Sequence, residues 1–294
     1  MLFDVFWTEA FRSLMPWAEL FFRGVTVLGS EYFYVVLIAI WFWAVDKRDS
    51  MLAVFVLIVS LVSNYWLKII LRNPRPPVTN WLSGVHASNY SLPSAHAQNS
   101  MVMWGWIGPK SRSWWMGALS VTLIGLIGLS RVYIGVHWLG DVVAGWAVGI
   151  LLLIAMWKLE EPTRSFLSKF NPNLQYLGLV IFGLGALILT ETLSPLTAEG
   201  LAANFGRSGG LIIGLGIGLA LEKRYVNFEM APKQGEKWRT ASRVILGLTM
   251  VFAIAASLSL VLPEEVYWMV TIQYALITIS VIFIWPLLFT KLGL

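Results

Sequence analysis

Two of the chain's three histidines stand in short polar clusters that interrupt a largely apolar sequence. His137 is followed four residues later by Asp141, and on a helix this spacing puts both side chains on one face. The carboxylate can then accept the N–H of the imidazole, which fixes the tautomer and leaves the other ring nitrogen free to attack. Arg131, just before this pair, can bind phosphate oxygens through two N–H groups. These residue types predict transfer of a phosphoryl group through a histidine.

A second cluster, Pro93-Ser94-Ala95-His96, stands where a loop enters an apolar segment. Ser94 suits the N-cap of a helix, and His96 then falls in the first turn. Free backbone N–H groups at a helix start attract phosphate oxygens. The cluster is therefore either a phosphate-binding helix start or a simple cap with a structural histidine.

Two cations form a third cluster. Lys68 ends an apolar segment, where a lysine commonly extends its ammonium group to the membrane interface. Arg75 lies between Pro74 and Pro76-Pro77, a sequence that stops a helix and stiffens the backbone, so the guanidinium should project from a rigid turn. Each cation suits phosphate, and each is also compatible with an ordinary interfacial or loop charge.

Composition indicates the environment in which these clusters lie. Hydrophobic residues make up 57% of the 294 positions, charged residues 13%, and the mean hydropathy is +0.72. A soluble domain of this length could not cover so much apolar surface, so we predict an all-α, polytopic membrane helical bundle. The formal charge of +5 comes without a basic stripe, which argues against nucleic acid as a partner. The absence of cysteine excludes disulfides, thiolate metal sites and cysteine nucleophiles.

Nine apolar segments are candidates for membrane spans, because a helix needs roughly 20 residues to cross the hydrocarbon core. They are residues 31–46, 51–71, 96–108, 114–134, 138–157, 174–193, 208–222, 243–262 and 266–290. Residues 1–30 mix charges with Phe, Leu and Trp, which favours an amphipathic segment lying in the interface over a cleaved signal peptide. We therefore expect an interfacial segment (1–30), a catalytic core (31–158) and additional transmembrane helices (159–294).

The distribution of basic residues predicts the orientation of the chain. If all nine segments cross, most of the 21 lysines and arginines collect on one side, and the positive-inside rule places that side in the cytoplasm. The cytoplasmic loops would be 47–49, 110–113, 158–170 and 223–243. The loop 73–95 and all three polar clusters then lie on the extracytoplasmic face, in the inner or plasma membrane if the source is prokaryotic.

The three clusters together resemble the signature of the type 2 phosphatidic acid phosphatase superfamily, which also contains glucose-6-phosphatase and the vanadium haloperoxidases. The resemblance covers about residues 68–141 and implies a helical-bundle core and a mechanism without a metal or other cofactor. It implies that His137 is the nucleophile that forms a phosphohistidine and that Asp141 orients it. His96 would protonate the leaving group and later activate water. The implied phosphate-binding residues are Lys68, Arg75, Ser94, Ala95 and Arg131.

One position departs from the commonest family pattern, which has glycine where this chain has Ala95. The added methyl group is tolerable unless the backbone there needs a positive φ. The additional spans resemble the longer branch that contains the sphingoid-base phosphate phosphatases and glucose-6-phosphatase. Trp81, Asn89 and Tyr90 could contact a headgroup, although ordinary interfacial residues are the favoured interpretation.

We therefore predict an integral membrane phosphatase that hydrolyses a phosphorylated lipid: phosphatidic acid, a polyprenyl diphosphate, phosphatidylglycerophosphate or a sphingoid-base phosphate. A lipid phosphotransferase, which passes the phosphoryl group to another lipid, is the alternative. A transporter of phosphorylated cargo is disfavoured, because the ionisable residues cluster at span ends and no internal repeat is present. The expected partners are the phosphorylated lipid and membrane lipids, and the sequence leaves the oligomeric state open.

Overall fold

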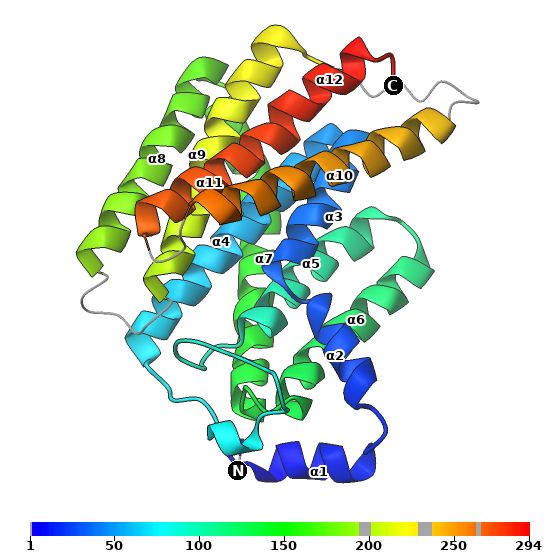
Figure 1. Ribbon diagram of the computed structural model, residues 1–294, viewed down its shortest axis with the longest axis vertical. Helices are drawn as coiled ribbons and strands as arrows, with labels where there is room; N and C mark the ends of the chain where they lie inside the picture. The colour runs from blue at the N-terminus through cyan, green and yellow to red at the C-terminus, as the bar shows by residue number, and fades with distance from the viewer. Residues whose placement is uncertain (1, 194–200, 229–236, 263–265) are drawn as a thin grey trace. The chain divides into compact units, whose positions relative to one another are not determined.

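The computed structural model describes residues 2–193, 201–228, 237–262 and 266–294 (Figure 1). Within these ranges the chain is helical and contains no strand, which confirms the all-α prediction. The first helices are α1 (Phe6–Leu14), α2 (Glu19–Val27), α3 (Glu31–Ala44), α4 (Lys47–Leu71), the short 3-10 helix η1 (Val78–Asn80), α5 (Ala95–Lys110), α6 (Trp114–Tyr133) and α7 (Leu139–Leu167). The later ones are α8 (Pro172–Leu193), α9 (Leu201–Tyr225), α10 (Lys237–Val261), α11 (Tyr267–Ile279), the π-helical turn η3 (Ser280–Ile284) and α12 (Trp285–Lys291).

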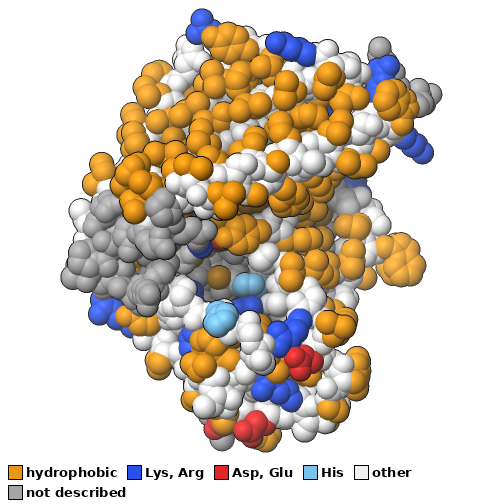
Figure 2. All heavy atoms as spheres, in the orientation of Figure 1, with side chains coloured by type: hydrophobic (Ala, Val, Ile, Leu, Met, Phe, Trp, Pro, Cys, Tyr) orange, Lys and Arg blue, Asp and Glu red, His pale blue; other side chains and the backbone are white. Residues whose placement is uncertain are grey.

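Seven of the described helices are long and apolar enough to cross a membrane, and an eighth span is added if α2 and α3, which meet at 54°, count as one. The prediction of nine spans is therefore approximate. The segment 96–108 forms α5, which has 16 residues. At 1.5 Å per residue α5 is about 24 Å long, shorter than a hydrocarbon core of about 30 Å. Much of the surface drawn in Figure 2 is apolar, as a helix bundle in lipid requires.

The chain divides into two compact units: residues 1–35 with 53–161, and residues 36–52 with 162–294. All the predicted site residues belong to the first unit. In the second unit α9 packs closely on α11 and α8, because glycines leave room for the neighbouring backbone. A Cβ on Gly210 would lie 2.3 Å from the Thr271 carbonyl oxygen, and one on Gly214 would lie 2.6 Å from that of Ala275. Part of the predicted cytoplasmic loop 223–243 lies outside the described residues.

A small apolar cluster in the first unit joins the three helices that carry the polar clusters. Ala97 of α5, Val132 of α6 and Val142 of α7 are all fully buried and form one contiguous core. Each of these residues is the sequence neighbour of a predicted site residue. Burial of the cluster therefore also fixes the backbone positions from which the polar side chains project.

A close approach between α7 and the start of α5 completes this arrangement. A Cβ on Gly145 would lie 2.7 Å from the Ser94 carbonyl oxygen and 3.0 Å from Cβ of Ala97, so a side chain at this position would push the helices apart. The backbone N–H of Ser94 also donates to the carbonyl oxygen of Asp141 at 3.0 Å. The two helix starts are thus locked together by packing and by a hydrogen bond.

Candidate active site

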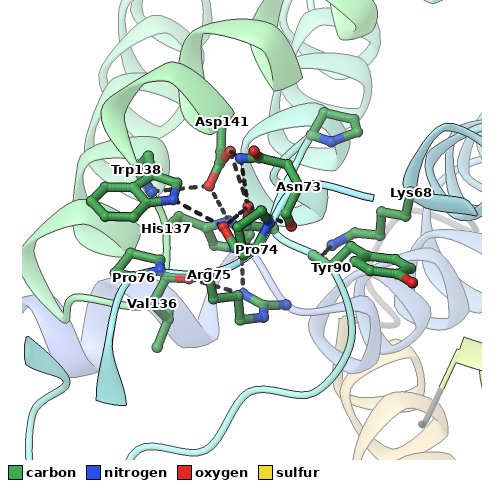
Figure 3. A network of polar contacts seen from close by, with 12 residues as sticks. Lys68, Asn73, Pro74, Arg75, Pro76, Tyr90, Val136, His137, Trp138 and Asp141 are labelled. Carbon is green, nitrogen blue, oxygen red and sulfur yellow. Dashed lines mark hydrogen bonds and ion pairs between the residues drawn. The ribbon is translucent and has the colours of Figure 1, made fainter. Parts of the chain in front are cut away.

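The side chains of His137 and Asp141 meet at the centre of the candidate site, and their contact is the one that their spacing predicts. His137 lies in the short connection between α6 and α7, and Asp141 lies in the first turn of α7. Nδ1 of His137 is 3.1 Å from Oδ2 of Asp141, and the side chains are 3% and 0% exposed (Figure 3). The backbone N–H of Trp138 donates to the same carboxylate oxygen at 2.9 Å. The pair is therefore buried and held in a single geometry.

Arg75 defines which nitrogen of His137 carries the proton. Its Nη1 lies 3.1 Å from Nε2 of the imidazole. A guanidinium can only donate, so Nε2 must accept, and the proton of the neutral ring resides on Nδ1, where it faces Asp141. The ring nitrogen on the side of Arg75 consequently carries no proton and has the lone pair that a nucleophile needs.

The Arg75 side chain is positioned by backbone carbonyl groups. Nη1 donates to Val136 at 2.9 Å, Nη2 donates to Ser88 at 2.8 Å, and Nε donates to Asn89 at 2.9 Å. Burial lowers the pKa of Arg75 to about 10, a change that the negative charge of Asp141 opposes, so the guanidinium stays protonated at neutral pH. The proline-rich loop thus presents a fixed positive charge next to His137, as the sequence predicts.

The second oxygen of Asp141 contacts two residues that sequence reasoning missed. The Asn73 amide nitrogen lies 3.4 Å from Oδ1, and the Ser91 hydroxyl lies 3.3 Å from it. The Ser91 hydroxyl also lies within hydrogen-bonding distance of the carbonyl oxygens of Asn73 and Pro74. Both residues flank the predicted clusters, but a short polar side chain next to a proline-rich loop is too common a feature to identify them in advance.

Lys68 lies in the last turn of α4 with its side chain buried, at 3% exposure. Its ammonium group donates to the Asn89 side-chain oxygen at 3.2 Å and to the carbonyl oxygen of Tyr90. Asn89 and Tyr90, for which an ordinary interfacial role is the favoured interpretation, thus both contact a predicted phosphate-binding lysine, Asn89 through its side chain and Tyr90 through its backbone. Trp81, the third residue of that interpretation, donates to the Pro76 carbonyl oxygen at 3.0 Å.

Ser94 is the N-cap of α5, and Ala95 is the first residue of that helix. The Ser94 hydroxyl is fully buried and makes no hydrogen bond to the part of the chain that the structure describes. Ala95 does not adopt a positive φ, so its methyl group adds no backbone strain where glycine is commoner. The helix start thus presents a free hydroxyl group, with His96 in its first turn.

Arg131 lies in the last turn of α6 and is 9% exposed. Its Nη1 donates to the Thr26 hydroxyl at 2.7 Å, whereas its buried Nε has no partner among the described residues. A guanidinium carries five N–H donors, and a buried one with unmet donors is suited to an anion. Thr26 is a further residue that the sequence did not single out.

The pKa of His137 depends on burial and on three of the other predicted site residues. Burial lowers the pKa of its imidazole well below the ordinary value, and the positive charges of Arg75, Arg131 and Lys68 lower it further, in that order. The side chain is therefore neutral at neutral pH and faces several cations. His86, in contrast, lies exposed in the loop before α5. Histidine and basic side chains are visible near one another on the face drawn in Figure 2.

Comparisons with known proteins identify the family of the chain. The sequence profile of the PAP2 superfamily matches residues 49–164, and that of the PAP2 superfamily phosphatase transmembrane extension matches residues 206–294. Sphingosine-1-phosphate phosphatase 1 from Mus musculus is 31% identical over 226 residues, which cover 71% of this chain and 51% of that protein. This chain thus spans about half the length of that relative.

Two microbial relatives are similar over shorter stretches. Phosphatidylglycerophosphatase B from Bacillus subtilis is 28% identical over 167 residues, 52% of this chain and 81% of that protein. Undecaprenyl-diphosphatase from Sulfolobus acidocaldarius is 30% identical over 130 residues, 41% of this chain and 60% of that protein. The first profile contains all eight predicted site residues, and the second begins within α9 and runs to the C-terminal residue. The chain belongs to the PAP2 superfamily.

Proposed function

We propose that this protein is a membrane lipid phosphatase that hydrolyses a phosphate monoester or diphosphate through a phosphohistidine on His137. One observation carries the proposal: Nδ1 of His137 faces the Asp141 carboxylate at 3.1 Å, while Nε2 faces the Arg75 guanidinium at the same distance. The unprotonated nitrogen of a neutral imidazole is thereby directed at a cation that can hold phosphate.

In the first step Nε2 of His137 attacks phosphorus, and the bond from phosphorus to the lipid oxygen breaks. His96 donates a proton to the leaving alkoxide, which departs as the lipid alcohol. Asp141 accepts the Nδ1–H hydrogen bond and stabilises the positive charge that the ring acquires. Lys68, Arg75 and Arg131, with the Ser94 hydroxyl and the backbone N–H of Ala95, hold the phosphate oxygens.

In the second step water attacks the phosphohistidine. His96, now unprotonated, accepts a proton from the water, and the bond between phosphorus and nitrogen breaks to release inorganic phosphate. Three protein cations neutralise the charge that builds on the phosphate oxygens, a role that metal ions fill in many other phosphatases. The proposed reaction therefore has no metal requirement.

A sphingoid-base phosphate stands first among the proposed substrates. The alignment with the mouse sphingosine-1-phosphate phosphatase covers 71% of the chain, compared with 52% for phosphatidylglycerophosphatase B and 41% for undecaprenyl-diphosphatase. Phosphatidylglycerophosphate and a polyprenyl diphosphate follow, and phosphatidic acid completes the set. With α5 counted as a span, the distribution of basic residues supports an active site on the extracytoplasmic face.

Purified protein assayed against these four classes of lipid, with a chelator present, tests the proposal. Release of inorganic phosphate from at least one class is expected, and His137→Asn should abolish it. Brief reaction with radiolabelled substrate and acid-free quenching should leave label on the wild-type protein and none on the variant. Exposed His86 provides the matched control, since His86→Asn should keep full activity. An inactive wild-type protein, or an active His137→Asn variant, would refute the mechanism.

A further inference from the structure

The junction between α2 and α3 is a fixed bend. The helices meet at 54°, and the Ser30 side chain serves both of them. Its hydroxyl donates to the carbonyl oxygen of Val27 at 2.7 Å and accepts from the backbone N–H of Phe33 at 3.2 Å. One side chain thus provides a hydrogen-bond partner for a backbone carbonyl at the end of the first helix and for a backbone N–H at the start of the second. The bend precedes residues 49–164, where the superfamily profile matches.

Thr26, in the last turn of α2, contacts Arg131 directly. Its hydroxyl oxygen accepts a hydrogen bond from Nη1 at 2.7 Å. A bond of this length to an ionised donor belongs to the stronger class of protein hydrogen bonds. Because Nε of the same guanidinium has no partner among the described residues, this bond is well placed to determine how the plane of the group is oriented.

Gly29 brings the same bend against the histidine of the second cluster. A Cβ at this position would lie 3.0 Å from Cδ2 of His96 and 2.3 Å from Cγ2 of Ile127. Ile127 is fully buried, so it has little room to move aside. The backbone of the bend therefore packs directly on the imidazole of His96, and only glycine permits this approach.

We propose that Thr26 and Gly29 form a positioning element of the active site. Thr26 orients the Arg131 guanidinium toward the phosphate oxygens, and Gly29 sets the place of the His96 ring relative to the leaving group. This inference rests on the proposed function, in which Arg131 binds phosphate and His96 is the acid. It adds a fourth segment to a site that the sequence signature describes with three.

Phosphate affinity tests the role of Thr26 and needs no turnover. Inorganic phosphate is titrated into purified protein by calorimetry. Thr26→Val removes the acceptor with little change of shape and should weaken phosphate binding about tenfold or more, whereas Thr26→Ser keeps the hydroxyl and should stay within about threefold of wild type. In an Arg131→Lys background Thr26→Val should change the affinity by less than about twofold, because the group that it positions is absent.

Leaving-group dependence tests the role of Gly29. Gly29→Ala should reduce hydrolysis of a phosphorylated lipid far more than hydrolysis of p-nitrophenyl phosphate, since only the poor leaving group needs a well-placed acid. Gly24→Ala is the matched control, because Gly24 lies in α2, five residues before Gly29, and a Cβ on it meets nothing within 4 Å. This control should keep both activities.

The outcomes separate this inference from the proposed function. If wild-type protein binds phosphate and hydrolyses lipid while Thr26→Val matches it in affinity, or Gly29→Ala slows both substrates equally, the positioning element is refuted and the phosphatase stands. An equal loss from Thr26→Val in the wild-type and Arg131→Lys backgrounds also refutes it, since the effect would not pass through Arg131. A wild-type protein that neither binds phosphate nor hydrolyses lipid refutes both.

Discussion

The Arg75 guanidinium lies 3.1 Å from Nε2 of His137, the nitrogen that is proposed to attack phosphorus. In the free protein the cation therefore occupies the direction from which phosphate must arrive. A phosphate oxygen can replace Nε2 as the acceptor of the Nη1 hydrogen bond, while the carbonyl oxygens of Ser88 and Asn89 continue to hold the rest of the side chain. In the proposed mechanism, substrate binding thus exchanges one acceptor for another and uncovers the nucleophile.

Replacement of Arg75 should impair catalysis strongly. Arg75→Gln removes the charge that stabilises the transferring phosphoryl group, and a loss of about 100-fold or more in kcat/KM is expected. Arg75→Lys should recover little of this loss, because an ammonium group cannot reproduce the planar set of donors. Steady-state kinetics with a short-chain phosphorylated lipid measure both effects.

Arg72 offers the matched control for this substitution. It lies three residues earlier, is exposed, and its Nε donates to the Ile69 carbonyl oxygen at 3.0 Å. Arg72→Gln should keep activity within about twofold of wild type. Equal losses at the two positions would mean that the Arg75 phenotype reflects only the loss of positive charge near the surface.

The pKa of His137 should lie well below the ordinary histidine value, because burial and the charges of Arg75, Arg131 and Lys68 all disfavour the imidazolium. The ring therefore stays neutral as the pH falls through 6.5, the ordinary histidine value, and it gains its proton only at lower pH. Arg75→Gln removes one of these charges and should raise the pKa.

Nuclear magnetic resonance of protein with isotope-labelled histidine measures this titration. The chain has three histidines, so the signal missing from His137→Asn identifies the residue. An imidazole signal for His137 that titrates at or above the ordinary histidine value of 6.5 would contradict the prediction. A shift to lower pH in Arg75→Gln would show that the assigned electrostatic cause has the wrong sign.

The two histidines of the site should differ in their response to the leaving group. His96→Ala should slow formation of the phosphoenzyme severely with a lipid alkoxide and only mildly with p-nitrophenyl phosphate, because the aryl oxide departs without a proton. His137→Ala should abolish reaction with both. Rapid-quench kinetics of the first step separate the cases, and equal losses from His96→Ala with the two substrates would exclude its role as the acid.

The orientation of the chain can be tested with single cysteines, since the natural chain has none. Ser83 and Ser111 are both exposed, the first in the loop before α5 and the second directly after that helix. In intact cells an impermeant thiol reagent should label Ser83→Cys and spare Ser111→Cys, whereas both should react after the membrane is permeabilised. The reverse pattern would move the active site to the cytoplasmic leaflet.

The central pair and the guanidinium beside it were predictable from sequence because their chemistry is local. His137 and Asp141 are one helical turn apart. Arg75 lies in a loop that is stiff because prolines flank it on both sides. Asn73, Ser91 and Thr26 were not predictable. They are short polar residues that reach the site through the fold, and no periodicity or spacing distinguishes them from ordinary loop and helix residues.

The helical class followed from composition, whereas the number of spans did not. Hydropathy registers apolar character along the chain, but α5 ends at Lys110, after only 16 residues, and α2 and α3 are joined by a bend. Helix length and direction depend on packing against neighbouring helices and on capping, such as that by Ser30. Neither can be predicted from the apolar segments of the sequence.

The buried cluster of Ala97, Val132 and Val142 has a consequence for how the protein can diverge. These residues lie at the ends of α5, α6 and α7 that are nearest to the site, and their packing fixes how the three helices are aligned with one another. The connection between α5 and α6, residues 111–113, lies at the far ends of the same two helices. Insertions of new sequence at that connection can therefore accumulate, or carry a fused domain, while the reacting groups keep their places.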